Sequence, residues 1–246
     1  MNNLWKYIII ATSVVLAAVV LSAAYTQRYR TQTGTITVTG LGETQFTSDL
    51  IVINGDITCE NYDAAEAYRE LESNRNKVVS FLTSKGVPAE TISFDMPSTS
   101  ELSTSVYENG NYMGSRFAGY RMTLSFSVES GEVDKVESAA RELPSLIAEG
   151  ISINVYDPMY YYSKLEDVKL DLLSAAAADA RERATKIARS SGAELGRLAM
   201  SRAGVFQITA ATGDEEFSAG GSFNLSSRQK KARVTVRAEY KIAQKY

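Results

Sequence analysis

The sequence contains no histidine among its 246 residues. This absence excludes zinc sites with imidazole ligands, Ser-His-Asp and Cys-His catalysis, and histidine-based pH switching. Cysteine occurs once, as Cys59, so the chain can form neither an internal disulfide nor a Cys-x-x-Cys pair. We expect Cys59 to be a small buried residue in a strand. These counts predict no catalytic residue, no metal site and no cofactor.

The sequence also lacks an excess of basic residues. Lys and Arg number 26 against 29 Asp and Glu, and because residues 1–30 hold three bases and no acid, the remainder carries a net charge of −6. A body of that sign is not attracted to phosphate backbones, so we expect no nucleic-acid partner. A composition of 44% hydrophobic and 22% charged residues is that of a globular protein, which excludes collagen-like, disordered and multi-pass membrane classes.

The longest uncharged run covers residues 8–24 and is interrupted only by Thr12, Ser13 and Ser22. It exceeds the usual apolar region of a signal peptide, roughly 7–15 residues, which favours an uncleaved transmembrane signal-anchor. A cleaved signal peptide stays open, because small residues stand where a cleavage site requires them. Aromatic residues flank the run and are candidates for the membrane interface. They are Trp5, Tyr7, Tyr25 and Tyr29.

These features predict a short N-terminal tail at 1–7, the anchor at 8–24, a polar spacer at 25–33 and one folded domain at 34–246. A short tail before a single hydrophobic segment usually exports everything that follows it. We therefore expect a single-pass protein of the inner (cytoplasmic) membrane that contacts the lipid bilayer through residues 8–24. Its body would lie in the periplasm or outside the cell.

The folded domain mixes strands and helices without regular βαβ alternation, and hairpins dominate. This pattern predicts an α+β fold with mainly antiparallel sheets and packed helices. Helices are expected from Asn61 or Asp63, either of which could cap the first turn, to about 85, and at about 132–143 and 164–191. Strands are expected at about 35–40, 50–59, 92–106, 117–128, 151–162, 198–208 and 232–243. Asn109-Gly110 marks the turn of a long hairpin.

Gly40-Leu41-Gly42 follows the first strand and resembles the opening of a dinucleotide fingerprint. Gln45 stands where the third glycine belongs, and the next element is a strand instead of a helix. We interpret the motif as a tight turn.

Carboxylates near strands keep a second class of function open. Glycoside-type chemistry needs two acids at a defined separation, and Asp56, Glu60, Asp95 and Glu101 are available. Tyrosines 156, 160, 161 and 162 could stack on sugars, although core or interface positions are more usual for them. The alternative reading is thus an envelope polysaccharide-binding module or hydrolase that uses carboxylates and tyrosines.

The hairpin and the last strand carry candidate contacts between copies. An exposed hairpin is a natural template for association. The basic residues of the last strand, at 228–245, could dock on the acidic surface of a neighbouring copy. Alternatively, these charges only keep a solvent-exposed edge strand from aggregating. The candidate oligomer contacts are Tyr107, Asn109, Tyr112, Arg233 and Arg237.

Five blocks in order resemble the SIMPL-domain family, which includes periplasmic immunogenic protein-like exported bacterial proteins. They are ITVTGLGE at 36–43, VVSFLTSKGVPAETIS at 78–93, GYRMTLSFSV at 119–128, DARERATKIARSSGAELGRL at 179–198 and VTVRAEYKI at 234–242. The resemblance implies an α+β fold, export, and ring- or cage-like homo-oligomers in some members. It brings no catalytic residues.

The hypothesis from the sequence is a non-enzymatic, membrane-anchored exported protein that self-assembles into a large homo-oligomer at the cell envelope. Envelope or stress maintenance is the expected setting. The protein's partner would be itself.

Overall fold

The computed structural model describes residues 2–30, 34–212 and 218–244. The elements in chain order are α1 (Asn2–Arg30), β1 (Thr35–Thr47), β2 (Leu50–Asn61), α2 (Ala64–Ser84), the 3-10 helix η1 (Ala89–Thr91), β3 (Ile92–Phe94), β4 (Ser98–Glu108), β5 (Asn111–Ser130), α3 (Val133–Glu142), the 3-10 helix η2 (Leu143–Glu149), β6 (Ser152–Val155), β7 (Met159–Tyr161), α4 (Leu165–Ser190), β8 (Ala193–Ala203), β9 (Gln207–Ala210), β10 (Ser222–Phe223) and β11 (Gln229–Gln244). Strand β2 pairs antiparallel with β5, β6 and β7, as do β3 and β4 with β5 and β8 with β11, whereas β9 and β10 pair in parallel. The α+β class with packed helices and mainly antiparallel sheets is confirmed.

The chain divides into two compact units. Unit 1 comprises residues 1–43, 170–205 and 233–246, and unit 2 comprises residues 44–169 and 206–232. The single folded domain expected at 34–246 is therefore built from two units, and the chain passes between them more than once.

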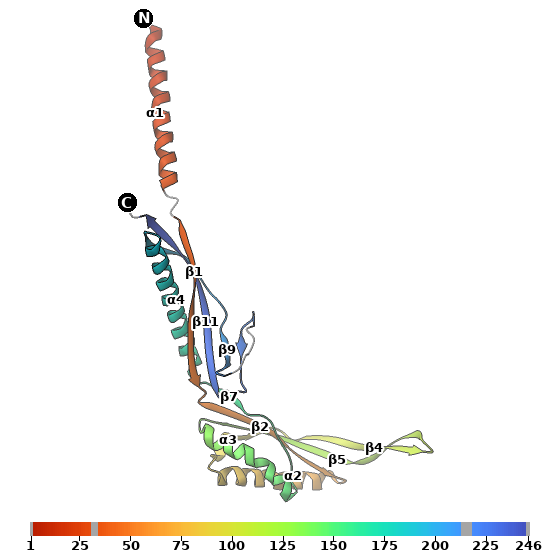
Figure 1. Cartoon of the computed structure of the whole chain (residues 1–246). Helices are drawn as coiled ribbons and strands as arrows, with labels where there is room; N and C mark the ends of the chain where they lie inside the picture. The colour runs from red at the N-terminus through yellow and green to blue at the C-terminus, as the bar shows by residue number, and fades with distance from the viewer. Residues whose placement is uncertain (1, 31–33, 213–217, 245–246) are drawn as a thin grey trace. The chain divides into compact units, whose positions relative to one another are not determined.

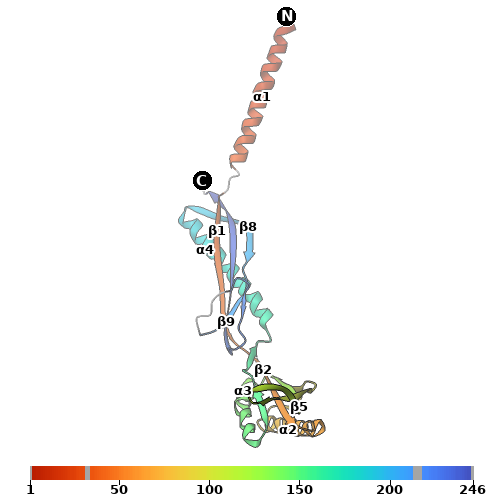
Figure 2. The same ribbon diagram turned by 90° about the vertical axis from the view of Figure 1, so that its right-hand side faces the viewer.

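Unit 1 is built on three strands, with β1 and β8 on either side of β11 and α4 packed on one face (Figures 1 and 2). The face toward α4 is small and apolar, and its core consists of Val38, Ala180, Ala184, Ala238 and Tyr240. Alternate residues of β1 and β11 point away from the helix, as the period of two in a strand requires. Within unit 1 that second face remains open.

The Gly40-Leu41-Gly42 motif lies inside β1, so its interpretation as a tight turn is wrong. A Cβ atom on Gly40 would lie 2.1 Å from the carbonyl oxygen of Ala176, and one on Gly42 would lie 2.3 Å from that of Leu172. The glycines let the strand backbone touch the backbone of α4. The Leu41 N–H donates to the Asp179 carboxylate at 2.8 Å, which ties strand and helix together.

Unit 2 contains a sheet in the order β3-β5-β2-β6, with β4 paired to β5 and β7 to β2. Helices α2 and α3 cover one face and enclose the larger core, centred on Ile53, Leu71, Leu124 and Val136 (Figure 1). Asp63 caps α2 by accepting from the N–H groups of residues 65 and 66, so the helix predicted at about 63–85 is confirmed. Cys59 is buried in β2 as expected.

The expected transmembrane anchor is wrong. Residues 8–24 lie in α1, yet among the described residues no helix is both long enough and apolar enough to cross a membrane. The inner-membrane localisation that depended on this segment is corrected with it.

Candidate functional site

The hairpin predicted at Asn109-Gly110 is present and brings its candidate residues together. Asn109 and Gly110 both have positive φ, 48° and 82°, the conformation that a tight two-residue hairpin requires. Tyr107 and Tyr112 are register partners beside this turn, and their ring centroids lie 5.7 Å apart. The turn therefore presents two aromatic side chains in edge-to-face contact at its tip.

The outer part of this hairpin, residues 103–117, is here called the arm. It consists of two strands, β4 and the start of β5, and β4 pairs with no other strand in the described chain (Figure 1). Every arm residue except Gly114 is exposed, including large apolar side chains. Tyr107 is 65% exposed and Met113 62%, and Val106, Tyr112 and Phe117 are also exposed.

Two arginines predicted as contacts lie on the open face of unit 1, with different surroundings. Arg233 forms an ion pair with Glu43 of β1. Arg237 lies directly opposite Arg202 in the β8–β11 register. The two facing arginines line a shallow groove of about 280 Å³. Its other lining residues are Thr37, Met200 and Glu239.

The predicted membrane-interface residues fall in or near α1. Trp5 is exposed. Tyr7, Tyr25 and Tyr29 belong to the helix, but their side chains lie outside the described part of the structure.

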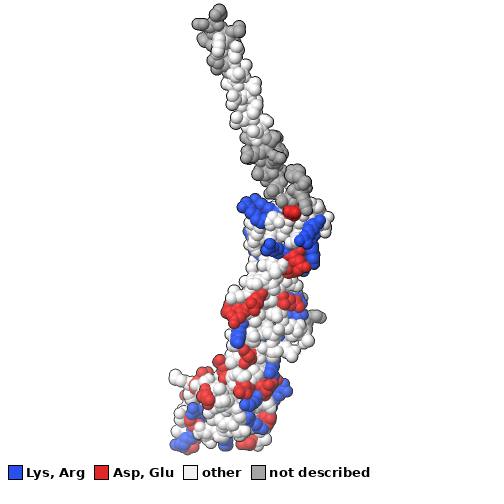
Figure 3. All heavy atoms as spheres, turned by 90° about the vertical axis from the view of Figure 1, so that its left-hand side faces the viewer, with Lys and Arg blue, Asp and Glu red and all other residues white. Residues whose placement is uncertain are grey.

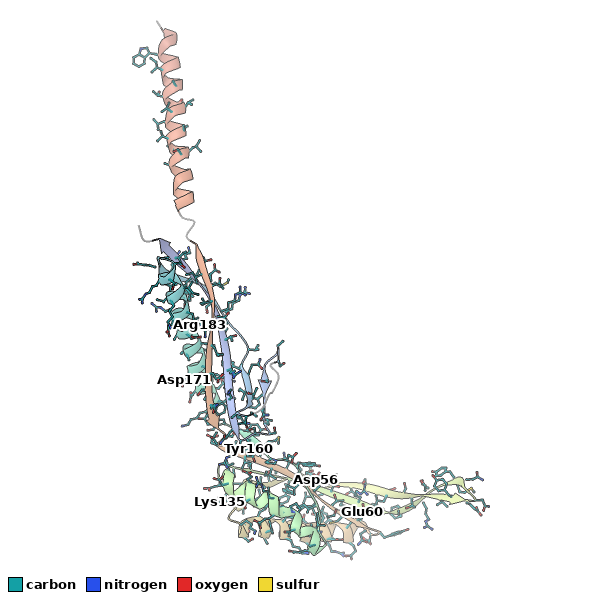
Figure 4. All side chains as sticks on the ribbon, viewed as in Figure 1. Asp56, Glu60, Lys135, Tyr160, Asp171 and Arg183 are labelled. Carbon is teal, nitrogen blue, oxygen red and sulfur yellow. The ribbon has the colours of Figure 1, made fainter. Side chains whose placement is uncertain are left out.

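The carboxylates considered for catalysis lie at different positions along the sheet of unit 2. Glu60 pairs with Arg121 on the neighbouring strand at 2.6 Å (Figure 4), and Glu101 is the register partner of Tyr120. The Asp95 N–H donates to the Ser125 carbonyl at 3.0 Å, so Asp95 and Asp56 lie on either side of Ser125. Asp56 on β2 accepts from Ser125 at 2.6 Å and from Tyr156 at 2.5 Å. The hydrogen bond to the Asp56 carboxylate raises the pKa of Tyr156 above its usual value, because the anion stabilises the phenol form.

The remaining tyrosines of the 156–162 cluster are mainly structural. Tyr160 is buried in the core of unit 2, and burial raises its pKa. Tyr162 packs on Phe46 with ring centroids 4.7 Å apart. In the part of the chain that the structure describes, no cluster of three or more Cys, Asp or Glu side chains could hold a metal ion.

The two units carry opposite charge. Unit 1 has 13 Lys and Arg against six acids, a net of +7, whereas unit 2 has 13 against 23, a net of −10. Figure 3 shows Lys and Arg gathered at one end of unit 1 on the face in view. The count for the whole chain conceals this asymmetry, because each unit is assembled from separate stretches of sequence.

Sequence reasoning missed the groove. The facing of Arg202 and Arg237 depends on the β8–β11 register, and nothing local in either strand specifies that register. Met200 and Glu239 join the groove for the same reason, as a second pair of register partners.

Comparison with known proteins covers nearly the whole folded part of the chain. Residues 36–240 match the model of the SIMPL family, described as proteins of unknown function (DUF541). No curated protein matches the sequence. Because the match spans far more than half of the 246 residues, the chain belongs to the SIMPL family.

Proposed function

We propose that this protein is non-catalytic and acts by assembling with copies of itself, with the arm of one copy docking on another. One observation carries the proposal. The arm exposes both faces and several large apolar side chains along a ribbon of only two strands.

Such a ribbon is poorly stabilised alone, because an isolated two-stranded hairpin is only marginally stable in water. Tyr107, Tyr112 and Met113 would each contribute about 1.5–3 kcal/mol if they were fully removed from solvent. Tyrosine and methionine are also enriched at protein interfaces. A docked arm is thus more stable than a solvated one.

The charges of the two units favour a second copy as the partner. Unit 1, with a net charge of +7, attracts unit 2 of another copy, which has a net charge of −10. Such a contact uses two different surfaces, so it is heterologous and builds rings or extended assemblies instead of simple two-fold dimers. A homo-oligomer of at least four chains is the expected product.

The Asp56 cluster supports a second candidate function, binding of a neutral polysaccharide. Tyr156 is 49% exposed, and its hydroxyl and the Ser125 hydroxyl both bond the Asp56 carboxylate, which keeps further lone pairs for sugar hydroxyls. Calorimetric titration with soluble glycan fragments tests it. Binding that is lost in Asp56→Asn or Tyr156→Ala would favour this function, and no heat of binding would eliminate it.

Sedimentation velocity of the full chain tests the assembly proposal. We expect a defined oligomer at micromolar concentration and moderate salt, and a shift toward monomer in the Tyr107→Ser, Tyr112→Ser, Met113→Ser triple variant. Tyr68→Ser with Met96→Ser is the matched control, since both side chains are exposed but lie outside the arm. A monomeric wild type, or an arm variant that assembles like the control, would overturn the proposal.

A further inference from the structure

The open face of unit 1 contains a charge arrangement that the isolated unit does not explain. Arg202 on β8 and Arg237 on β11 are exposed register partners, so two like charges lie directly opposite each other. Like charges at directly opposed positions destabilise a sheet. This pair therefore costs stability unless an anion is placed against it.

Some other cations of unit 1 pair with acids of the same unit. Arg233, on the same face of β11, pairs with Glu43, and Arg183 on α4 pairs with Asp179 (Figure 4). Among the described residues, Arg202 and Arg237 have no ion-pair partner. The groove that they line is also lined by Thr37, Met200 and one acid, Glu239, so the two guanidinium groups outnumber the carboxylates there.

These features describe a receptor for a carboxylate that arrives with apolar or aromatic neighbours. Two guanidinium groups can hold one carboxylate through charge-assisted hydrogen bonds, and its charge would remove their mutual repulsion. Guanidinium groups also stack on aromatic rings, and the Met200 sulfur makes favourable contacts with them.

The arm tip matches this chemistry. Glu108 is exposed at the tip opposite Asn111, with exposed Val106 on the same face of β4, while the Tyr107–Tyr112 pair lies on the other face of the tip. The tip belongs to unit 2, of net charge −10, and the groove to unit 1, of net charge +7. We propose that the arm tip of one copy docks in the Arg202–Arg237 groove of a second copy, with the Glu108 carboxylate between the two guanidinium groups. This inference rests on the proposed function and names the surface that receives the arm.

Charge reversal tests the pairing by sedimentation velocity and by concentration-dependent light scattering of the full chain. Glu108→Arg and Arg237→Glu should each weaken association by about tenfold or more, as expected when one member of an interfacial charge pair is lost. Their combination in one chain should recover part of the association that each single variant loses, because opposite charges again face each other at positions 108 and 237 while Arg202 is retained.

Two matched controls keep the test specific. Glu101→Arg reverses an acid of β4 away from the tip, and Arg197→Glu reverses an exposed base of β8 outside the groove. We expect both to leave association nearly unchanged. Circular dichroism of every variant should match that of the wild type.

The outcomes separate this inference from the proposed function. Restoration in the double reversal, with inert controls, supports the tip-in-groove contact. If the arm triple variant disassembles but neither Glu108→Arg nor Arg237→Glu has an effect, assembly through the arm stands and the groove is overturned as its receptor. Two weak single variants without restoration also overturn it, since the groove would then receive some other anion. A monomeric wild type overturns both proposals.

Discussion

The contact between Gly40 and α4 gives the sharpest prediction about stability. Alanine at position 40 would place its Cβ atom 2.1 Å from the Ala176 carbonyl oxygen and 2.4 Å from the Ala180 amide nitrogen. A carbon–oxygen contact normally needs about 3.3 Å or more, so strand and helix must separate by roughly 1 Å. Both obstructing atoms belong to the helix backbone, and no side-chain rotation can relieve the contact.

The cost follows from what that separation disrupts. Overpacking of a close-packed interior typically costs about 1–3 kcal/mol, and a gap of roughly 1 Å forfeits up to half of each dispersion contact across the β1–α4 interface. The Leu41 N–H bond to the Asp179 carboxylate lengthens as well, which adds to the loss. We expect Gly40→Ala to lower the free energy of unfolding by about 3 kcal/mol.

Urea unfolding followed by circular dichroism measures this difference. Gly131→Ala is the control, because its Cβ would meet nothing closer than 3.6 Å, the Asp49 carbonyl oxygen, and its φ is not positive. The control should change stability by less than about 0.5 kcal/mol. A Gly40→Ala protein as stable as the control would refute the close approach of β1 to α4. Ala180→Gly added to Gly40→Ala should not rescue stability, because the clash with backbone atoms remains.

Three further predictions concern titration and burial. The hydrogen bonds from Arg183 and from the Leu41 N–H lower the pKa of Asp179 in the folded protein. The carboxylate therefore stabilises the fold fully above its unfolded pKa, and this stabilisation is lost as the pH falls through the folded pKa. Urea unfolding at stepwise lower pH should show a smaller acid-induced decrease in the free energy of unfolding for Asp179→Asn than for wild type. Lys230 is 1% exposed and donates to the carbonyls of Asn224 and Ser227. Lys230→Met should therefore lower the free energy of unfolding by about 2 kcal/mol, measured in urea. An unchanged free energy of unfolding would contradict the role of Lys230 in holding the loop that contains Asn224 and Ser227. Burial raises the pKa of the Cys59 thiol, so alkylation at pH 8 should be slow in the native protein and rapid in urea; fast native labelling would contradict its burial.

Local sequence patterns were sufficient where the deciding forces are local. The Asn109-Gly110 turn follows from two residues that tolerate positive φ, and the start of α2 follows from Asp63 as a capping side chain. Alternation of apolar and polar residues placed the strands predicted at 35–40, 50–59, 117–128 and 232–243 inside β1, β2, β5 and β11, and the helical period placed α2 and α4. The strands predicted at 92–106, 151–162 and 198–208 are each divided between two observed strands. The α+β class and the SIMPL resemblance required nothing more.

The same local reasoning failed at α1 and at Gly40-Leu41-Gly42. An uncharged run suggested a membrane anchor, whereas no helix among the described residues is long and apolar enough to cross a membrane. Gly40 and Gly42 suggested a turn because glycine is common in turns. The interpretation failed because the backbone that they contact, that of α4, lies more than a hundred residues away in sequence.

Composition by itself determined what this protein cannot use: without histidine and with one buried thiol, imidazole and disulfide chemistry are closed to it. Only the tertiary structure decided where charge accumulates. It gathers separate stretches into one unit of +7 and another of −10, and it sets Arg202 opposite Arg237 through the register of β8 on β11. A shift of that register by one residue would turn one arginine to the other face of the sheet. Pairing between distant strands, which no local pattern encodes, therefore creates the groove.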